Sequence, residues 1–171
     1  GRRYPYFIRT RPSDAFSALA MLDILQNLWR YTGIALVHST DTYGIGWAEA
    51  FTAVIYASGM NVLVTQRFEQ DTNDFSRSIR VLLASGARVV VLATHASEAA
   101  RFLRVAYQVG LGGEGYLWCG AHSYARLWDS DTVLAANTVL RDLVLKGFFS
   151  VASGGQLVET PHYQRYHALR Q

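Results

Sequence analysis

The sequence predicts an α/β fold, a three-layer sandwich in which helices cover both faces of a mainly parallel five-stranded sheet. Three observations lead to this prediction. Short apolar runs closed by polar turn residues alternate with segments of helical periodicity, which is typical of βαβ units. The runs IALV and VVVL are continuously apolar, as in strands covered on both faces. A chain of 171 residues is also long enough to bury a core as one domain.

The first predicted element is a long helix from Asp14 to about Tyr31. Ser13 precedes it in the N-cap position, and Asp14 places an acid in the first turn, where it favours the helix dipole. Pro12 stands just before the cap, where its missing N–H costs nothing. Apolar residues then recur at helical spacing.

Strands and helices alternate in the rest of the chain. The apolar runs predict five strands, at 34–38, 61–66, 88–93, 115–119 and 147–151. The helical patterns between them predict helices at 46–58, 72–85, 97–109 and 131–145. We expect the strand order 2-1-3-4-5, with helices on both faces and right-handed crossovers.

The charge of the chain is low and scattered. The 16 Lys and Arg and 13 Asp and Glu residues give a net charge of +3. Charged residues make up 17 % of the chain, below the roughly 25 % of ordinary soluble domains. The Arg residues form no basic run and do not alternate with aromatic residues, which argues against nucleic-acid binding. No stretch of about 18 apolar residues lacks both charge and glycine, so we expect no transmembrane span.

The chain carries no familiar catalytic or metal-binding motif. Its one cysteine, Cys119, excludes an internal disulfide framework and a zinc site built from several thiolates. His95 and His122 lack a third ligand at a recognisable spacing, so no metal and no cofactor is predicted. The segment 44–46 fails as a dinucleotide-binding motif, because Glu49 stands where the third glycine belongs. No G-x-S-x-G elbow, P-loop or HExxH motif is present, and we predict no enzyme.

Candidate binding residues follow three of the predicted strands. Ligands of open parallel sheets bind where the carboxyl ends of the strands form a crevice, because loop amides and helix N-termini converge there. The loops after the first, third and fourth strands are rich in hydroxyl, imidazole and phenol groups, which suit a small polar ligand. For Ser39, Thr94 and Ser97 a plainer interpretation is a helix cap or turn residue. The candidates are Ser39, Asp41, Tyr43, Thr94, His95, Ser97 and His122.

Two stretches of the sequence carry a more specific pattern. YPYFIRTRPSDAFSALAMLDIL contains an F-x-R-x-x-P-S-D segment that leads into the long helix, and YTGIALVHSTDTYGIG is a strand that ends in a D-x-Y-G turn. In this order and spacing they resemble the ligand-binding region shared by class C G-protein-coupled receptors, natriuretic-peptide receptors and type I periplasmic binding proteins. The last group includes the leucine-isoleucine-valine-binding proteins. The resemblance covers about residues 4 to 151.

This resemblance implies one lobe of an extracytoplasmic clamshell, in which two α/β lobes close on a small molecule without transforming it. Residues 1–151 are then expected to be the second lobe with its incoming crossing, and 152–171 an outgoing crossing toward a first lobe that this chain lacks. A cell-surface receptor ectodomain or a periplasmic protein is the expected setting. A homodimer or larger assembly is the expected state.

The resemblance also assigns roles to particular residues. Tyr43 matches the tyrosine that packs on the ligand, Asp14 matches the acid that begins the first helix, and 94–97 match a wall of the cleft. After the fourth strand, amino-acid-binding members carry an acid that pairs with the ligand ammonium, whereas this chain has Ala121, flanked by His122. Loss of such an ion pair costs several kcal/mol of affinity. This departure speaks against an α-amino acid and permits an anionic or neutral ligand.

Three functions remain open from the sequence. The leading hypothesis is a ligand-sensing or solute-binding lobe for a small polar molecule, amino-acid-like or anionic. The alternative is a structural or protein-interaction domain that has lost ligand binding, with its Trp and Tyr residues serving a dimer or a partner. An α/β enzyme is the third, and it rests on the fold alone. Ligand-dependent closure separates the first from the second, and turnover of a substrate is required for the third.

Overall fold

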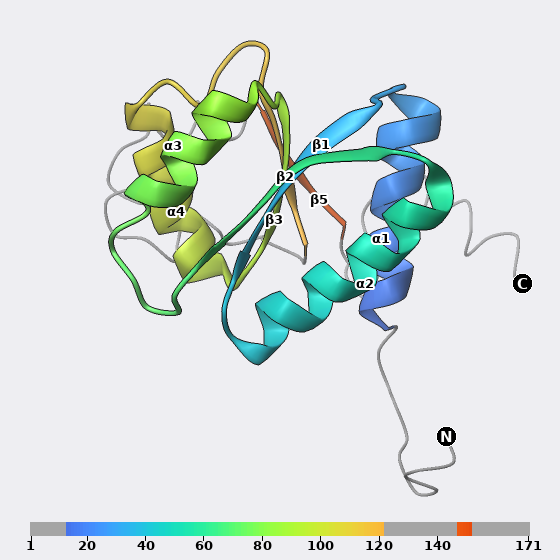
Figure 1. Cartoon of the computed structure of the whole chain (residues 1–171), viewed down its shortest axis with the longest axis horizontal. Coiled ribbons are helices and arrows are strands. Elements are labelled where there is room, and N and C mark those ends of the chain that lie inside the picture. Colours follow the sequence, from blue (N-terminus) through green and yellow to red (C-terminus); the bar gives the residue numbers. More distant parts are fainter. Residues whose placement is uncertain (1–12, 122–146, 152–171) are drawn as a thin grey trace, which may run out of the picture.

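The computed structural model describes residues 13–121 and 147–151 (Figure 1). Helices and strands alternate along them as predicted. In chain order they are α1 (Asp14–Asp23), the π-helical turn η1 (Ile24–Leu28), β1 (Gly33–Ser39), α2 (Thr42–Ser58), β2 (Asn61–Phe68), α3 (Ser76–Ser85), β3 (Val89–Ala93), α4 (Ala96–Gln108), β4 (Leu117–Gly120) and β5 (Phe148–Ser150). The helix predicted at 131–145 lies outside the described residues. In the described parts of the chain, no helix combines the length and apolar character needed to cross a membrane.

The five strands form one sheet with the order β2-β1-β3-β4-β5, and every neighbouring pair is parallel. This confirms the predicted fold class and strand order. Figure 1 shows α1 and α2 on one side of the sheet and α3 and α4 on the other. The chain therefore forms three layers, with the sheet in the middle.

The two faces of the sheet carry separate hydrophobic clusters. Successive side chains of a strand point to opposite faces. Ile34 and Leu36 of β1 accordingly belong to the cluster under α1 and α2, and Ala35 and Val37 to the cluster under α3 and α4. All four side chains are at most 1 % exposed. The continuous apolar run in β1 thus feeds both clusters at once, as the sequence predicted.

Cys119 on β4 belongs to the cluster under α1 and α2 and is fully buried. Burial raises the pKa of its thiol well above the ordinary value, because a thiolate is poorly solvated among apolar side chains. A free thiol of this kind behaves as a small hydrophobic residue.

The start of α2 was predicted at Gly46, and the structure places it at Thr42. The cause is Asp41, whose side chain caps the helix by accepting a hydrogen bond from the backbone N–H of Gly44. Glycines are poor helix formers, so their presence favoured a loop in the sequence. The cap rather than the propensity sets the start of this helix.

The start of α3 was predicted at Thr72, and the structure places it at Ser76. Local side-chain hydrogen bonds hold the preceding residues in a turn. The Thr72 hydroxyl accepts from the backbone N–H of Asp74 at 3.1 Å, and the Asp74 carboxylate accepts from that of Ser76 at 3.0 Å. Such bonds offer the backbone an alternative to the helix.

The first helix is also less regular than predicted. Ser13 occupies the N-cap position, but its side chain makes no capping hydrogen bond. At the other end, α1 widens into η1, where the Trp29 N–H donates to the Ile24 carbonyl five residues earlier at 3.0 Å. Arg30 then adopts a left-handed backbone conformation with φ of 61°, which ends the helix before β1.

Candidate ligand-binding site

A tight turn at Asp41 leads the chain from β1 into α2. The carboxylate Oδ1 of Asp41 accepts hydrogen bonds from the Gly44 N–H at 2.8 Å and from the Ser39 hydroxyl at 2.6 Å. A Cβ at Gly44 would overlap both the hydroxyl and the carbonyl oxygen of Ser39, so only glycine fits there. This turn sets the N-terminus of α2 directly against the carboxyl end of β1.

The other oxygen of the same carboxylate reaches the N-terminus of α4. Asp41 Oδ2 lies 3.0 Å from His95 Nε2. The His95 ring also stacks on the Tyr43 ring, with centroids 4.9 Å apart and planes 26° from parallel. We call Ser39, Asp41, Tyr43 and His95 the rim cluster. It joins the carboxyl ends of β1 and β3, which are neighbours in the sheet.

Asp41 is the electrostatic centre of the rim cluster. Burial alone would raise its pKa, but hydrogen bonds from Ser39 and Gly44 and the adjacent His95 outweigh burial, so the pKa is lowered from its ordinary value. The carboxylate is therefore ionised at neutral pH and accepts three donors from within the chain. The carboxylate accepts from His95 Nε2, so that ring nitrogen carries the hydrogen of this contact.

The two partners of this ion pair differ in exposure. The Asp41 side chain is 10 % exposed and the His95 side chain is 56 % exposed. The imidazole is therefore the more accessible group of the pair.

Thr94 links the end of β3 to α4 through its side chain. It is fully buried, and its hydroxyl donates to the carboxylate of Glu98 in the first turn of α4. The second oxygen of Glu98 accepts from the backbone N–H of Asp71 at 2.9 Å. Glu98 is only 3 % exposed, and its carboxylate connects α4 to the loop after β2. Sequence reasoning missed Glu98; the available signal was an acid in a first helical turn close behind a strand.

The remaining predicted residues lie in different surroundings. Ser97 is exposed in the first turn of α4, and Ala121 is buried just after β4, where its N–H donates to the Leu92 carbonyl at 3.0 Å. Asp14 is exposed at the first residue of α1, which begins on the same side of the molecule as α2 (Figure 1). His122 lies outside the described residues. Among residues 13–121 and 147–151, no three His, Cys, Asp or Glu side chains could hold a metal ion.

The place of the rim cluster in the sheet defines the class of protein. In a sheet of order 2-1-3-4-5 the strand order reverses between β1 and β3, and open α/β sheets bind ligands at that reversal. The rim cluster lies there, beside the N-termini of α2 and α4. The chain is therefore an α/β domain whose polar residues converge where ligands of this architecture bind.

Comparison with known proteins gives the family. The receptor family ligand binding region matches residues 1–166, and the chain belongs to this family. Metabotropic glutamate receptor 4 of Macaca fascicularis is 33 % identical over 128 residues, which are 71 % of this chain and 14 % of that receptor. The chain thus spans about a seventh of the length of this relative. The resemblance predicted from the sequence is confirmed.

Two solved structures share the fold. The leucine-binding protein LivK of Thermotoga maritima superposes with a TM-score of 0.70 at 15 % identity, over 95 % of this chain and 43 % of that one. The amino acid ABC transporter substrate-binding protein of Pseudomonas fluorescens Pf-5 superposes with a TM-score of 0.68 at 19 % identity, over 92 % and 40 %. At these identities the likeness shows the architecture alone.

Proposed function

We propose that this chain is the second lobe of a two-lobe clamshell that binds a small polar molecule outside the cytoplasm, in a receptor ectodomain or a solute-binding protein. The observation that carries the proposal is the rim cluster, which gathers Asp41, Tyr43 and His95 at the strand-order reversal. The family match supports it, and so does a match to less than half of each solved structure. In this proposal 1–151 form the lobe, 152–171 lead toward the first lobe, and the lobes assemble as dimers.

The chemistry of the rim favours a ligand in which negative or neutral groups face this lobe. Asp41 is already engaged by three donors of the chain, so it has little capacity left for a ligand ammonium. Ala121, which the resemblance matches to an acid of amino-acid-binding members, is apolar and 1 % exposed. The half-exposed imidazole of His95 can donate to an anion when protonated. An amino-acid-like ligand would therefore present a carboxylate to His95.

The rim cluster does not support an enzyme, although it contains a serine, a histidine and an aspartate. In a catalytic triad the serine hydroxyl bonds to the histidine, and the histidine bonds to the aspartate. Here Ser39 is fully buried and donates to Asp41, and His95 bonds to the other oxygen of the same carboxylate. The hydroxyl is thus directed at the acid rather than at the base. We propose binding without chemistry.

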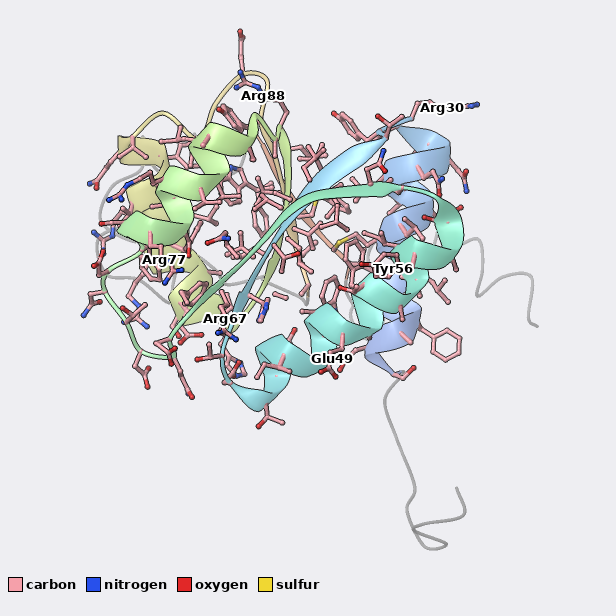
Figure 2. The ribbon with its side chains drawn as sticks, viewed as in Figure 1. Arg30, Glu49, Tyr56, Arg67, Arg77 and Arg88 are labelled. Atoms are coloured by element: carbon pink, nitrogen blue, oxygen red, sulfur yellow. The ribbon has the colours of Figure 1, made fainter. Side chains whose placement is uncertain are left out.

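Chemical-shift mapping by NMR tests this proposal on the 171-residue chain. L-glutamate and glutarate are the probes, because glutarate keeps both carboxylates and lacks the ammonium. Because a single lobe binds weakly, we expect shifts at Tyr43 and His95 that saturate only at high concentrations of either probe, and binding of glutarate at least as strong as that of glutamate. His95→Gln should abolish the shifts with either probe. Arg88→Gln, at the opposite edge of the sheet (Figure 2), is the control that should leave them unchanged.

A different pattern of shifts would contradict the proposal. Shifts that remain in His95→Gln would remove His95 from the site. Strong binding of glutamate with none of glutarate would mean that this lobe recognises the ammonium. Hydrolysis or conversion of a probe would replace binding by catalysis.

A further inference from the structure

β2 is an edge strand of the sheet, and no helix among the described residues covers its carboxyl-terminal half on the side of α2. Leu36 of β1 pairs with Thr65, and His38 pairs with Arg67, so these four side chains share one face of the sheet. Leu36 is buried in the cluster under α1 and α2, whereas Thr65 and Arg67 are exposed. Parallel sheets are ordinarily covered on both faces. Here α2 covers β1 and leaves the end of β2 open.

A groove of about 510 Å³ occupies this open face between α2 and the two strands. One wall of the groove is formed by α2. The residues of α2 that line it, from Ile45 to Tyr56, recur three or four positions apart and so lie in one stripe along one face of the helix. Such a stripe covers about 16 Å of helix at 1.5 Å per residue. Its floor includes Leu36 and Ala48, which are 1 % and 6 % exposed. Both the volume and the apolar floor suit a small molecule, since ligand pockets measure about 300–1,000 Å³.

Two opposite charges line the groove. Glu49 stands on α2 and Arg67 on β2, and Figure 2 shows Arg67 near the N-terminus of the helix with Glu49 further along it. Both residues are exposed, and they do not form an ion pair with each other within 4.0 Å. Within the described residues neither side chain has another charged or hydrogen-bonding partner. Tyr56, 82 % exposed, adds an aromatic ring at the far end of the same stripe.

We propose that this groove is a second binding site, separate from the rim cluster, for a small zwitterion with an apolar or aromatic body. Arg67 binds the carboxylate through its planar guanidinium fork, and Glu49 binds the ammonium. The apolar body lies over Leu36 and Ala48 and against Tyr56. A zwitterion fits because it supplies both missing partners at once. An anionic ligand would be repelled by Glu49, and a cationic ligand would be repelled by Arg67.

NMR mapping with L-phenylalanine as the probe tests this proposal on the 171-residue chain. We expect saturable shifts at 45–56 and 65–67 at millimolar concentrations. N-acetylphenylalanine lacks the cation, phenylalaninamide lacks the anion, and glycine lacks the apolar body. Each should bind more weakly than phenylalanine. Loss of one exposed ion pair should weaken binding by about two- to fivefold.

Matched variants separate the charges from general effects. Arg67→Gln and Glu49→Gln should each weaken phenylalanine binding, with Arg67→Gln removing the preference over phenylalaninamide and Glu49→Gln the preference over N-acetylphenylalanine. Ala53→Trp should block the groove and abolish the shifts while the spectrum of the core stays intact. The controls are Arg77→Gln on α3 and Glu114→Gln before β4, both exposed and outside the groove.

Three results would overturn the proposal. Shifts that do not saturate, or that persist unchanged in Arg67→Gln and Glu49→Gln, would mean no specific site. Shifts confined to Tyr43 and His95 would support the rim cluster and exclude the groove. Sedimentation showing a dimer that Ala53→Trp dissociates would mean that a second copy of the chain covers this face. None of these outcomes depends on whether glutarate binds at the rim cluster.

Discussion

The amino ends of the parallel strands lie together on one side of the sheet, which we call the amino edge, and their carboxyl ends lie on the other, the carboxyl edge. Polar residues have different roles at these two edges. At the amino edge, α2 and α3 end in the same manner. The Ser58 and Ser85 hydroxyls donate to carbonyls three residues earlier, at 2.8 and 2.7 Å, and each accepts from the backbone N–H two residues later, at 3.2 Å. Gly59 and Gly86 follow in left-handed conformations. These two hydroxyls serve only the local backbone, whereas the Gln26 side-chain amide donates to the Ser58 carbonyl at 3.0 Å and links η1 to the end of α2.

At the carboxyl edge, two charged side chains connect separate elements. Asp41 reaches from the start of α2 to His95 before α4, and Glu98 reaches from α4 to the loop after β2. These two side chains make bonds to other elements that the turns at this edge do not need for their own backbone hydrogen bonds. The comparison supports the proposal that the binding site lies at the carboxyl edge, where two carboxylates link separate elements.

The largest expected effect comes from the turn that carries the rim cluster. Gly44→Ala places a methyl group against both oxygens of Ser39. We expect a loss of about 1–3 kcal/mol in the free energy of unfolding, measured by urea denaturation. Gly46→Ala is the matched control in the same helix, because nothing lies within 4 Å of its Cβ position. It should gain up to about 1 kcal/mol, since alanine is the better helix former. Equal effects of the two substitutions would contradict the close approach at Gly44.

Removal of the Asp41 cap should have the next largest effect. Asp41→Ala should cost about 0.5–2 kcal/mol of unfolding free energy, as for other N-caps. The pKa of Asp41 is lowered in the folded chain, so its contribution is present above about pH 3.9 and is lost as the pH falls through the lowered value. The stability of the wild type should therefore decline more steeply in acid than that of Asp41→Asn. Parallel pH profiles for the two proteins would mean that the carboxylate contributes nothing.

Much of the fold could be predicted from the sequence because each rule used was local or topological. The apolar runs at β1 and β3 predicted the strands, and the alternation of strands and helices predicted a doubly wound parallel sheet, for which the order β2-β1-β3-β4-β5 is common. The bond between Asp41 and His95 could not be predicted, since the two residues are far apart in sequence and meet only when β1 and β3 pair. Glu98 was missed for a similar reason. An acid in the first turn of an amphipathic helix is usually exposed, and its burial depends on the loop that packs on it.

The stacked rings of the rim cluster should show a smaller energetic coupling. A double-mutant cycle of Tyr43→Leu and His95→Leu in urea denaturation should give about 0.5–1.5 kcal/mol, the range for stacked aromatic pairs. A coupling of zero would mean that the rings touch without stabilising each other. The cluster would then be less ordered than its geometry indicates.

The smallest effect is expected at the amino edge. Ser85→Ala removes one local hydrogen-bonding hydroxyl and should cost about 0.5–1 kcal/mol, with no change in the shifts that glutarate produces at His95. Loss of those shifts in Ser85→Ala would break the distinction between the two edges.

Calorimetry on this chain and on the longer two-lobe protein that the proposal predicts, with the same ligand, tests the clamshell most directly. A clamshell gains affinity from contacts across the cleft that exist only when both lobes close. Three lost hydrogen bonds of about 1.5 kcal/mol each correspond to roughly a thousandfold in affinity. We therefore predict that the isolated chain binds about a thousandfold more weakly than the two-lobe protein. Equal affinities would mean that this lobe holds a complete site and would contradict the clamshell account.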